Sequence, residues 1–231
     1  MAKRKDGIET RERILRVACR VFADKGYHDA TVEEICSQAG TNIAAINYHF
    51  GSKDQLYAQV WRCAFDEANK AYPPEGGLGS DAPAEDRLRG TIHSLVGRAV
   101  NPSRIGHAGK LLLRELVYPT DVIEDVKHKA MGRLQRRMDA LMRDLLGPEA
   151  SEEQRLLCAM SIAHQCITIG VQLFTGRMPP HVRIDKPSEE LVETLTDHIN
   201  RFSLAGLNAI RNSIKTGPKQ HLSATATEMG E

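Results

Sequence analysis

The 231-residue chain has few aromatic residues, at 5%, and one tryptophan. No apolar run approaches the length of a membrane span, so no membrane partner is expected. Its five cysteines are widely spaced, odd in number and without a C-x-x-C pair, which favours small reduced side chains in apolar helices. The first residues, MAKRKDGIETRER, are charged where a signal peptide would be apolar, which predicts a cytoplasmic protein.

The sequence also lacks the short motifs of common enzymes and metal sites. It contains no glycine-rich phosphate loop and no nucleophile elbow. Its nine histidines include no close pair with metal-ligand spacing such as H-x-x-x-H. These absences predict no catalytic residue, no metal ion and no cofactor.

The charge of the chain is nearly balanced but unevenly placed. The net formal charge of +1 argues neither for nor against a nucleic-acid partner. The first twenty residues, however, hold seven basic and three acidic side chains. A basic end on a near-neutral protein can face phosphates, although a solvated tail explains the same charges.

Helical periodicity, punctuated by glycine and proline, runs through the whole chain, and no strand alternation competes with it. The predicted fold class is therefore all-α. Residues 1–71 form a compact N-terminal unit of three helices and the start of a fourth. Residues 72–84 are rich in proline and glycine and predict a flexible connector. Residues 85–212 predict a second helical domain, and residues 213–231 a small, polar, disordered tail.

The stretch AGTNIAAINYHFGSK predicts a short helix between a glycine turn and a new helix start. Gly40 ends the preceding helix, Asn42 caps the short one, and Ser52 opens the next. Three helices with tight turns, the last one short, form the helix-turn-helix pattern, whose last helix enters the major groove of DNA. Ile46 is expected to lock this helix onto the other two.

The predicted DNA contacts fall into two groups. Small or amide side chains near the start of the short helix are placed to meet bases, and polar or charged side chains around it are placed to meet phosphates. The base-facing group is Ile43, Ala44, Ala45 and Asn47, with the cap Asn42 beside it. Asn47 can pair with adenine or reach a phosphate instead. The phosphate-facing group is Thr31, Tyr48, His49 and Lys53.

The segment TVEEICSQAGTNIAAINYHFGSKDQLY resembles the DNA-binding domain of the TetR family of transcriptional regulators. Cys36 replaces the usual alanine, and Asn47 replaces the usual first aromatic residue of the aromatic-aromatic-His-Phe run. The resemblance covers about residues 8–71. The positions that match are Thr31, Ile35, Gly40, Tyr48, His49, Phe50, Lys53 and Leu56.

The rest of the chain is similar to the CecR-type subgroup of that family through LLLRELVYPTDVIEDV. The resemblance implies a homodimer that represses promoters at a near-palindromic DNA operator. It also implies release of the DNA when a small-molecule effector enters the C-terminal domain.

Two C-terminal helices predict a dimer interface. The stretch LLCAMSIAHQCITIGVQLF is apolar on nearly all sides, and the last helix carries a continuous apolar stripe. The alternative is a core within one subunit. The residues expected at a four-helix interface are Ala163, Gly170, Leu195, Ile199 and Phe202.

An effector pocket is predicted among the C-terminal helices, where polar groups and adaptable methionines interrupt apolar faces. Each of these residues, taken alone, is also explained by a structural role. The candidates are His93, Arg114, Glu115, His128, Met131, Met138, His164 and Gln165.

Together these features predict a ligand-responsive, DNA-binding transcriptional regulator that acts as a homodimeric repressor and is not an enzyme. Two alternatives remain at this stage. One is an enzyme with its active site in the C-terminal helices, and the other is a DNA-binding protein without a ligand.

Overall fold

The computed structural model describes residues 2–178 and 189–216. Within these residues the chain is helical and has no strand, which confirms the all-α fold class. Short 3-10 turns, η1 (Pro74–Gly77), η2 (Pro102–Ile105) and η3 (Asp121–Ile123), join some of the helices. The helices are α1 (Ala2–Asp29), α2 (Val32–Ala39), α3 (Ile43–Phe50), α4 (Lys53–Ala71), α5 (Ala84–Val100), α6 (His107–Val117), α7 (Glu124–Leu146), α8 (Glu152–Thr175) and α9 (Glu189–Thr216).

Side chains next to the helix starts cap them as the sequence predicts. The Ser52 hydroxyl accepts a hydrogen bond from the backbone N–H of Gln55 at 3.2 Å, which opens α4. At α8, Ser151 and Gln154 form a complete capping box, in which each side chain accepts from the other residue's backbone. These bonds satisfy N–H groups that have no partner within the helix.

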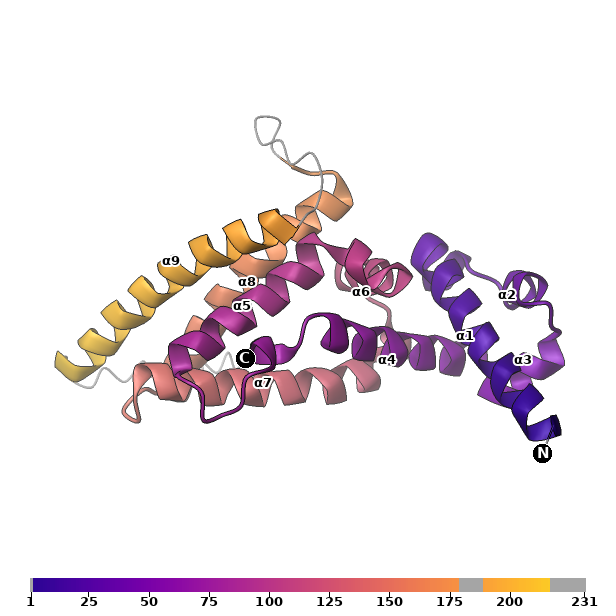
Figure 1. Ribbon diagram of the computed structural model, residues 1–231, viewed down its shortest axis with the longest axis horizontal. Helices are drawn as coiled ribbons and strands as arrows, with labels where there is room; N and C mark the ends of the chain where they lie inside the picture. Colours follow the sequence, from indigo (N-terminus) through magenta and orange to yellow (C-terminus); the bar gives the residue numbers. More distant parts are fainter. Residues whose placement is uncertain (1, 179–188, 217–231) are drawn as a thin grey trace, which may run out of the picture.

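The molecule is elongated, with α1, α2 and α3 together at one end and α9 at the other (Figure 1). α4 leads from the first end toward α5 and α7 (Figure 1). α1 is interrupted at Gly26, whose φ of +84° is accessible to glycine without strain.

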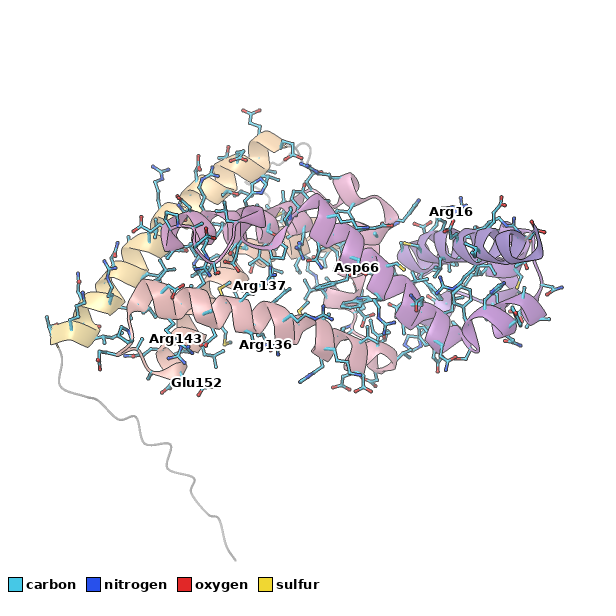
Figure 2. All side chains as sticks on the ribbon, turned by 60° about the horizontal axis from the view of Figure 1, so that its bottom comes forward. Arg16, Asp66, Arg136, Arg137, Arg143 and Glu152 are labelled. Atoms are coloured by element: carbon cyan, nitrogen blue, oxygen red, sulfur yellow. The ribbon has the colours of Figure 1, made fainter. Side chains whose placement is uncertain are left out.

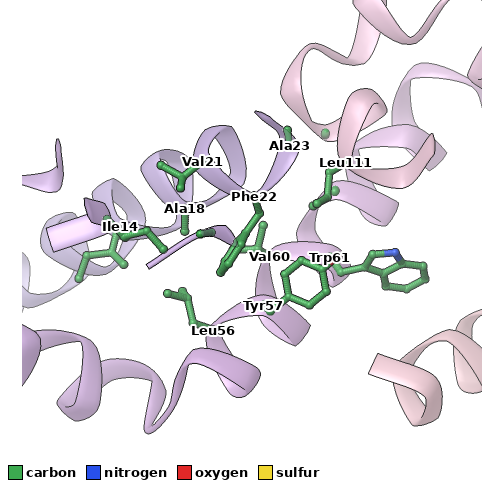
Figure 3. Close-up of a cluster of buried hydrophobic side chains, with 14 of the residues drawn as sticks. Ile14, Ala18, Val21, Phe22, Ala23, Leu56, Tyr57, Val60, Trp61 and Leu111 are labelled. Atoms are coloured by element: carbon green, nitrogen blue, oxygen red, sulfur yellow. The ribbon is translucent and has the colours of Figure 1, made fainter. Parts of the chain in front are cut away.

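Two hydrophobic cores hold the helices together, and they do not follow the chain order. The first core joins α1 to α4 with Ile105, Leu111 and Ile123 from beyond the connector. Figure 3 shows Leu111 of α6 beside Phe22 and Tyr57 in this core. The second core is built from α5, α7, α8 and α9. α6 therefore packs with the N-terminal unit, across the predicted domain boundary.

The predicted connector is partly packed rather than free of contacts. Glu75 in η1 is 8% exposed and accepts a hydrogen bond from Arg87 of α5 at 2.6 Å. Arg87 also pairs with Asp144 of α7 at 2.8 Å. These ion pairs hold η1 against α5 and α7. The proline and glycine content of the segment does not predict this packing. The predicted tail begins later than expected, because α9 continues to Thr216, and residues 217–231 lie outside the described residues.

Gly170, which the sequence analysis places at the dimer interface, lies against α5 within the chain. A Cβ atom at Gly170 would lie 2.3 Å from the carbonyl oxygen of Ala99, so the backbones of α5 and α8 approach closely here.

We therefore expect Gly170→Ala to lower the free energy of unfolding by about 1–3 kcal/mol, because the added methyl group must push the two helices apart. Gly132→Ala on α7 is the matched control, since its Cβ would meet only Arg136 at 3.6 Å, and it should raise stability by up to about 1 kcal/mol. Urea unfolding of both variants measures the effect. Equal shifts of the two midpoints would contradict the close contact.

Candidate nucleic-acid interface

α3 is a two-turn helix with a buried side and an exposed side. Ile46 is fully buried and Phe50 is 8% exposed, and both belong to the first core. On the other side Tyr48 is 84% exposed and Ile43 is 45% exposed. The exposed side chains of α3 are Ile43, Ala44, Asn47 and Tyr48. Because its inner face is packed against the first core, α3 can enter a DNA groove while it remains folded.

The turn before α3 is closed by local hydrogen bonds. Gly40 has a φ of +60° and its N–H donates to the carbonyls of Cys36 and Ser37, which ends α2. The Asn42 side chain accepts from the backbone N–H of Ala45 at 2.9 Å. Thr31 caps α2 in the same way by accepting from Glu34 at 3.1 Å. Thr31 and Asn42 therefore have structural roles in addition to any contact with DNA.

α1 fixes the position of α2 through two arginines. The Nε atom of Arg13 donates to the carbonyl of Ala39 at 2.8 Å, and Arg20 donates to Gln38 at 2.8 Å. Both bonds lie near the end of α2, next to the turn. They orient the turn, and with it α3, relative to the first core.

Besides Thr31 and Asn42, four predicted DNA contacts also have partners in the protein: Ala45, Tyr48, His49 and Lys53. Ala45 is half-buried against the first core. The ring of His49 lies 5.0 Å from that of Tyr48 in a T-shaped arrangement. The Lys53 ammonium lies 4.5 Å from the centre of the Tyr27 ring and 3.4 Å from the carbonyl of His28. The structure thus keeps the charge of Lys53 at the start of α4, while Ala45 contributes to packing.

A buried polar network joins α4 to α6. Glu115 is 3% exposed and accepts from the Tyr57 hydroxyl at 2.6 Å, the Thr120 N–H at 2.8 Å and the Lys127 ammonium at 2.9 Å. Burial and the hydrogen bond to Glu115 raise the pKa of Tyr57, so the phenol remains a donor at neutral pH. Glu115 is therefore a structural link and not a wall of a pocket.

Arg114 forms a second link between the two parts of the chain. Its guanidinium donates to the carbonyls of Asp24 at 3.3 Å and Lys25 at 2.9 Å, beside the break in α1 at Gly26. Lys110 pairs with Asp24 at 2.6 Å on the same side of α6. Arg114 was a candidate pocket residue, but it cannot line a pocket in the C-terminal bundle while it holds the end of α1.

A cleft of about 600 Å³ opens between α4 and α7. The rings of Trp61 and Phe65 stack at 5.2 Å with an interplanar angle of 14°, and both line it. Its volume is typical of small-molecule sites. The lining residues are Trp61, Arg62, Phe65, Asp66, Asn69, Pro74, Val126, Lys129, Ala130, Arg133, Leu134 and Arg137.

The other candidate pocket residues do not come together. His93 faces Glu193 of α9 at 3.2 Å. His128 and Met131 are exposed on α7. His164 and Gln165 bond to the backbone of their own helix, at Met160 and Ser161. Met138 is the exception, because it lines a cavity of about 60 Å³ that adjoins the cleft through the shared residues Pro74, Leu134 and Arg137.

Some of the residues predicted at the dimer interface belong to the core of the chain, and others are exposed. Ile199 is 4% exposed, and Leu195 packs against the second core, so neither faces outward. Phe202 is 64% exposed. Ala163 is half-buried. Large apolar side chains exposed on the same two helices are Leu156, Leu157, Met160 and Ile210.

The expectation that no apolar run approaches the length of a membrane span is wrong for α8 (Glu152–Thr175). This helix is long and apolar enough to cross a membrane by length and composition, with a mean hydropathy of 1.5 in its most apolar window. Only 22% of that window is buried within the chain. Such a helix is weak evidence for a membrane span, since an apolar helix of a soluble protein passes the same test. In the described part of the chain, no three His, Cys, Asp or Glu side chains are grouped to hold a metal ion.

Comparison with known proteins identifies the family to which this geometry belongs. Residues 14–60 match the bacterial regulatory proteins of the tetR family, and residues 84–207 match the C-terminal domain of the HTH-type transcriptional dual regulator CecR. The chain belongs to the TetR family. It is a helix-turn-helix transcriptional regulator with a CecR-type C-terminal domain, which confirms the family and the regulatory function predicted from the sequence.

Relatives and solved structures agree with this assignment. The CecR protein of Shigella flexneri is 24% identical over 212 residues, 87% of this chain and 94% of its own length. YerO of Bacillus subtilis, a transcriptional regulator, is 26% identical over 209 residues, 87% of this chain and 68% of its own. A TetR-like regulator from Rhodococcus has the same fold, with a TM-score of 0.61 at 17% identity over 86% of this chain and 96% of its own.

Two features that connect the parts of this TetR-family protein were not predicted from its sequence. Tyr57 was not predicted to pair with Glu115, because 58 residues separate them in the chain. The cations Lys129, Arg133 and Arg137 recur every four residues on α7 and could have been recognised as one helix face. Nothing in the sequence shows that this face meets Trp61 and Phe65.

Proposed function

We propose that the protein is a cytoplasmic homodimeric repressor that leaves its near-palindromic operator when a small molecule binds the C-terminal domain. The observation that carries the DNA-binding half is α3, whose inner face is buried while Tyr48 is 84% exposed. The name of one relative supports repression, since IcaR of Staphylococcus aureus is a negative transcriptional regulator, whereas CecR is a dual regulator. IcaR is 34% identical over 59 residues, which are 26% of this chain and 32% of its own length.

On DNA, we assign Ile43, Ala44 and Asn47 to the bases, because they are exposed near the N-terminal end of α3. Tyr48 and Lys53 are assigned to phosphates. The Lys53 ammonium has three donor hydrogens, so its contact with His28 leaves capacity for an anion. His49 is half-buried and is assigned to a phosphate at the edge of the interface.

The dimer is supported by the apolar side chains that one chain leaves uncovered on α8 and α9. Phe202 and Leu157 are 64% and 56% exposed. Several large apolar side chains exposed on two helices favour an interaction surface there. A second copy of the same helices would cover them and form a four-helix interface. We therefore assign dimerisation to α8 and α9. Together with the proposed effector site, this gives the C-terminal domain a role in assembly and ligand binding and not in catalysis.

α4 is suited to carry the response. Its first residue, Lys53, lies beside α1 and the DNA-binding unit, and its later residues Trp61, Phe65 and Asn69 line the cleft with α7. Two α3 helices must sit about 34–36 Å apart to enter successive major grooves. A ligand that favours one position of α4 over another changes that spacing, provided its affinity differs between the two states.

Tyr48→Ala tests the DNA-binding half of the proposal. We expect the affinity for an operator selected from a randomised duplex pool to fall by about tenfold or more, because a hydrogen bond to a charged phosphate is lost. The melting temperature should not change, since the side chain is 84% exposed. Fluorescence anisotropy with labelled duplex measures the affinity.

Tyr118→Ala is the matched control, because this tyrosine is 61% exposed at the end of α6. It should bind the operator like the unmodified protein. An unchanged affinity for Tyr48→Ala would show that α3 does not meet DNA in this orientation.

A further inference from the structure

The cleft between α4 and α7 has an apolar floor and a charged rim. Trp61 is 4% exposed and stacks on Phe65, and Leu134 and Val126 add apolar surface from α7. A flat apolar body can lie against this surface with little loss of side-chain freedom, since the two rings are already stacked.

The charges that line the cleft are strongly unequal. Four cationic side chains, Arg62, Lys129, Arg133 and Arg137, face it, against one carboxylate, Asp66. Figure 2 shows Asp66 and Arg137 on the sides of α4 and α7 that border the cleft. The ion pairs found among the described residues include none of these five side chains. A concave surface with an excess of one charge attracts the opposite charge from solution.

A half-buried arginine adds to this excess. Arg98 of α5 lines the adjoining small cavity together with Arg137. Its guanidinium donates to the Asn69 side chain at 2.9 Å and to the Tyr72 carbonyl at 2.6 Å, both neutral acceptors, and its buried Nε has no hydrogen-bond partner in the described structure. Burial lowers the pKa of Arg98 to about 10. Partial burial of a cation without a carboxylate partner is unfavourable, and an anion nearby would reduce that cost.

We infer that the cleft between α4 and α7 binds a small organic anion, in which an acidic group meets Arg137 and Arg133 while a flat aromatic body lies against the half-buried Phe65, with Trp61 stacked behind it. The inference rests on the proposed function, because it names the chemical class of the effector. It differs from the pocket predicted among α5 to α8, since α4 supplies one wall.

Two probes of the same shape separate charge from apolar contact. Naphthalene-1-carboxylate carries the acidic group, and naphthalene-1-carboxamide is its neutral counterpart. Isothermal titration of the full-length protein should show the carboxylate binding about tenfold tighter or more, because bonds between a guanidinium and a carboxylate are charge-assisted. Raising the salt concentration should reduce this preference, since the cleft is open to solvent.

Arg137→Gln tests whether the carboxylate binds in the cleft between α4 and α7. We expect it to lower the preference for the carboxylate by about tenfold. Arg136→Gln is the control, because Arg136 is the next residue on α7, is exposed and does not line the cleft (Figure 2). It should leave the preference unchanged. The fluorescence of Trp61, the one tryptophan of the chain, provides a second readout at the cleft.

Equal affinities for the two probes, no binding of the carboxylate at millimolar concentration, or an unchanged preference in Arg137→Gln would each overturn the inference. None of these results touches DNA binding, which the Tyr48→Ala experiment tests separately. If the carboxylate binds as expected but leaves operator affinity unchanged, the cleft is an anion site and the proposed release mechanism fails instead.

Discussion

Replacement of Glu115 by alanine is expected to lower the free energy of unfolding by about 3 kcal/mol or more. The side chain is 2% exposed and accepts hydrogen bonds from Tyr57, Thr120 and Lys127. Its removal leaves a buried hydroxyl and a buried N–H without partners, and a half-buried ammonium without its counter-charge. Denaturant unfolding followed by circular dichroism measures the loss.

Tyr57→Phe is a milder variant that tests the same buried network. It removes one hydroxyl from the network and keeps the ring in the first core, so it should cost about 1–2 kcal/mol. Glu149→Ala, which removes an exposed carboxylate between α7 and α8, should stay within about 0.5 kcal/mol of the unmodified protein. A Glu115→Ala variant as stable as Glu149→Ala would mean that the network does not hold α4 to α6.

Charges placed on exposed apolar residues of α8 and α9 are expected to convert the proposed dimer into monomers. Leu157 and Phe202 are 56% and 64% exposed, so Leu157→Arg with Phe202→Arg should not disturb the core of one chain. In a dimer, however, the two arginines would have to be buried without partners. Operator affinity should fall by about 10²–10⁴-fold, because two half-sites are no longer bound together.

Sedimentation and far-ultraviolet circular dichroism distinguish loss of assembly from loss of folding. Leu116→Arg, on an exposed leucine of α6, is the control and should sediment like the unmodified protein. A double variant that stays dimeric would place the interface elsewhere. A substitution at Gly170, which the sequence analysis places at the interface, would not test the dimer, because Gly170 packs against Ala99 within the chain.

Local interactions explain why the DNA-binding unit could be predicted closely. Thr31, Asn42 and Ser52 each accept from an N–H three residues ahead. Gly40 ends α2 by donating its backbone N–H to carbonyls of the last turn of that helix. Such bonds depend on neighbouring residues alone, so the sequence contains all of their partners.

The effector pocket could not be predicted in the same way. Glu115 and Arg114 are polar residues in an apolar stretch, which fits a pocket wall as well as a buried link. Only the contacts with Tyr57 and with the carbonyls of α1 decide between the two. Ile199 and Phe202 lie on the same apolar stripe of the sequence, yet one is 4% and the other 64% exposed.

The sequence by itself determined the helices, their caps, the buried face of α3 and the resemblance to the TetR family. The tertiary structure decided which helices face each other: α6 joins the first core, Gly170 meets α5, and α4 forms the cleft with α7. The reason is the range of the forces involved. Helix periodicity and caps act over three to four residues, whereas a cleft or a buried network needs side chains brought together from distant parts of the chain by the packing of whole helices.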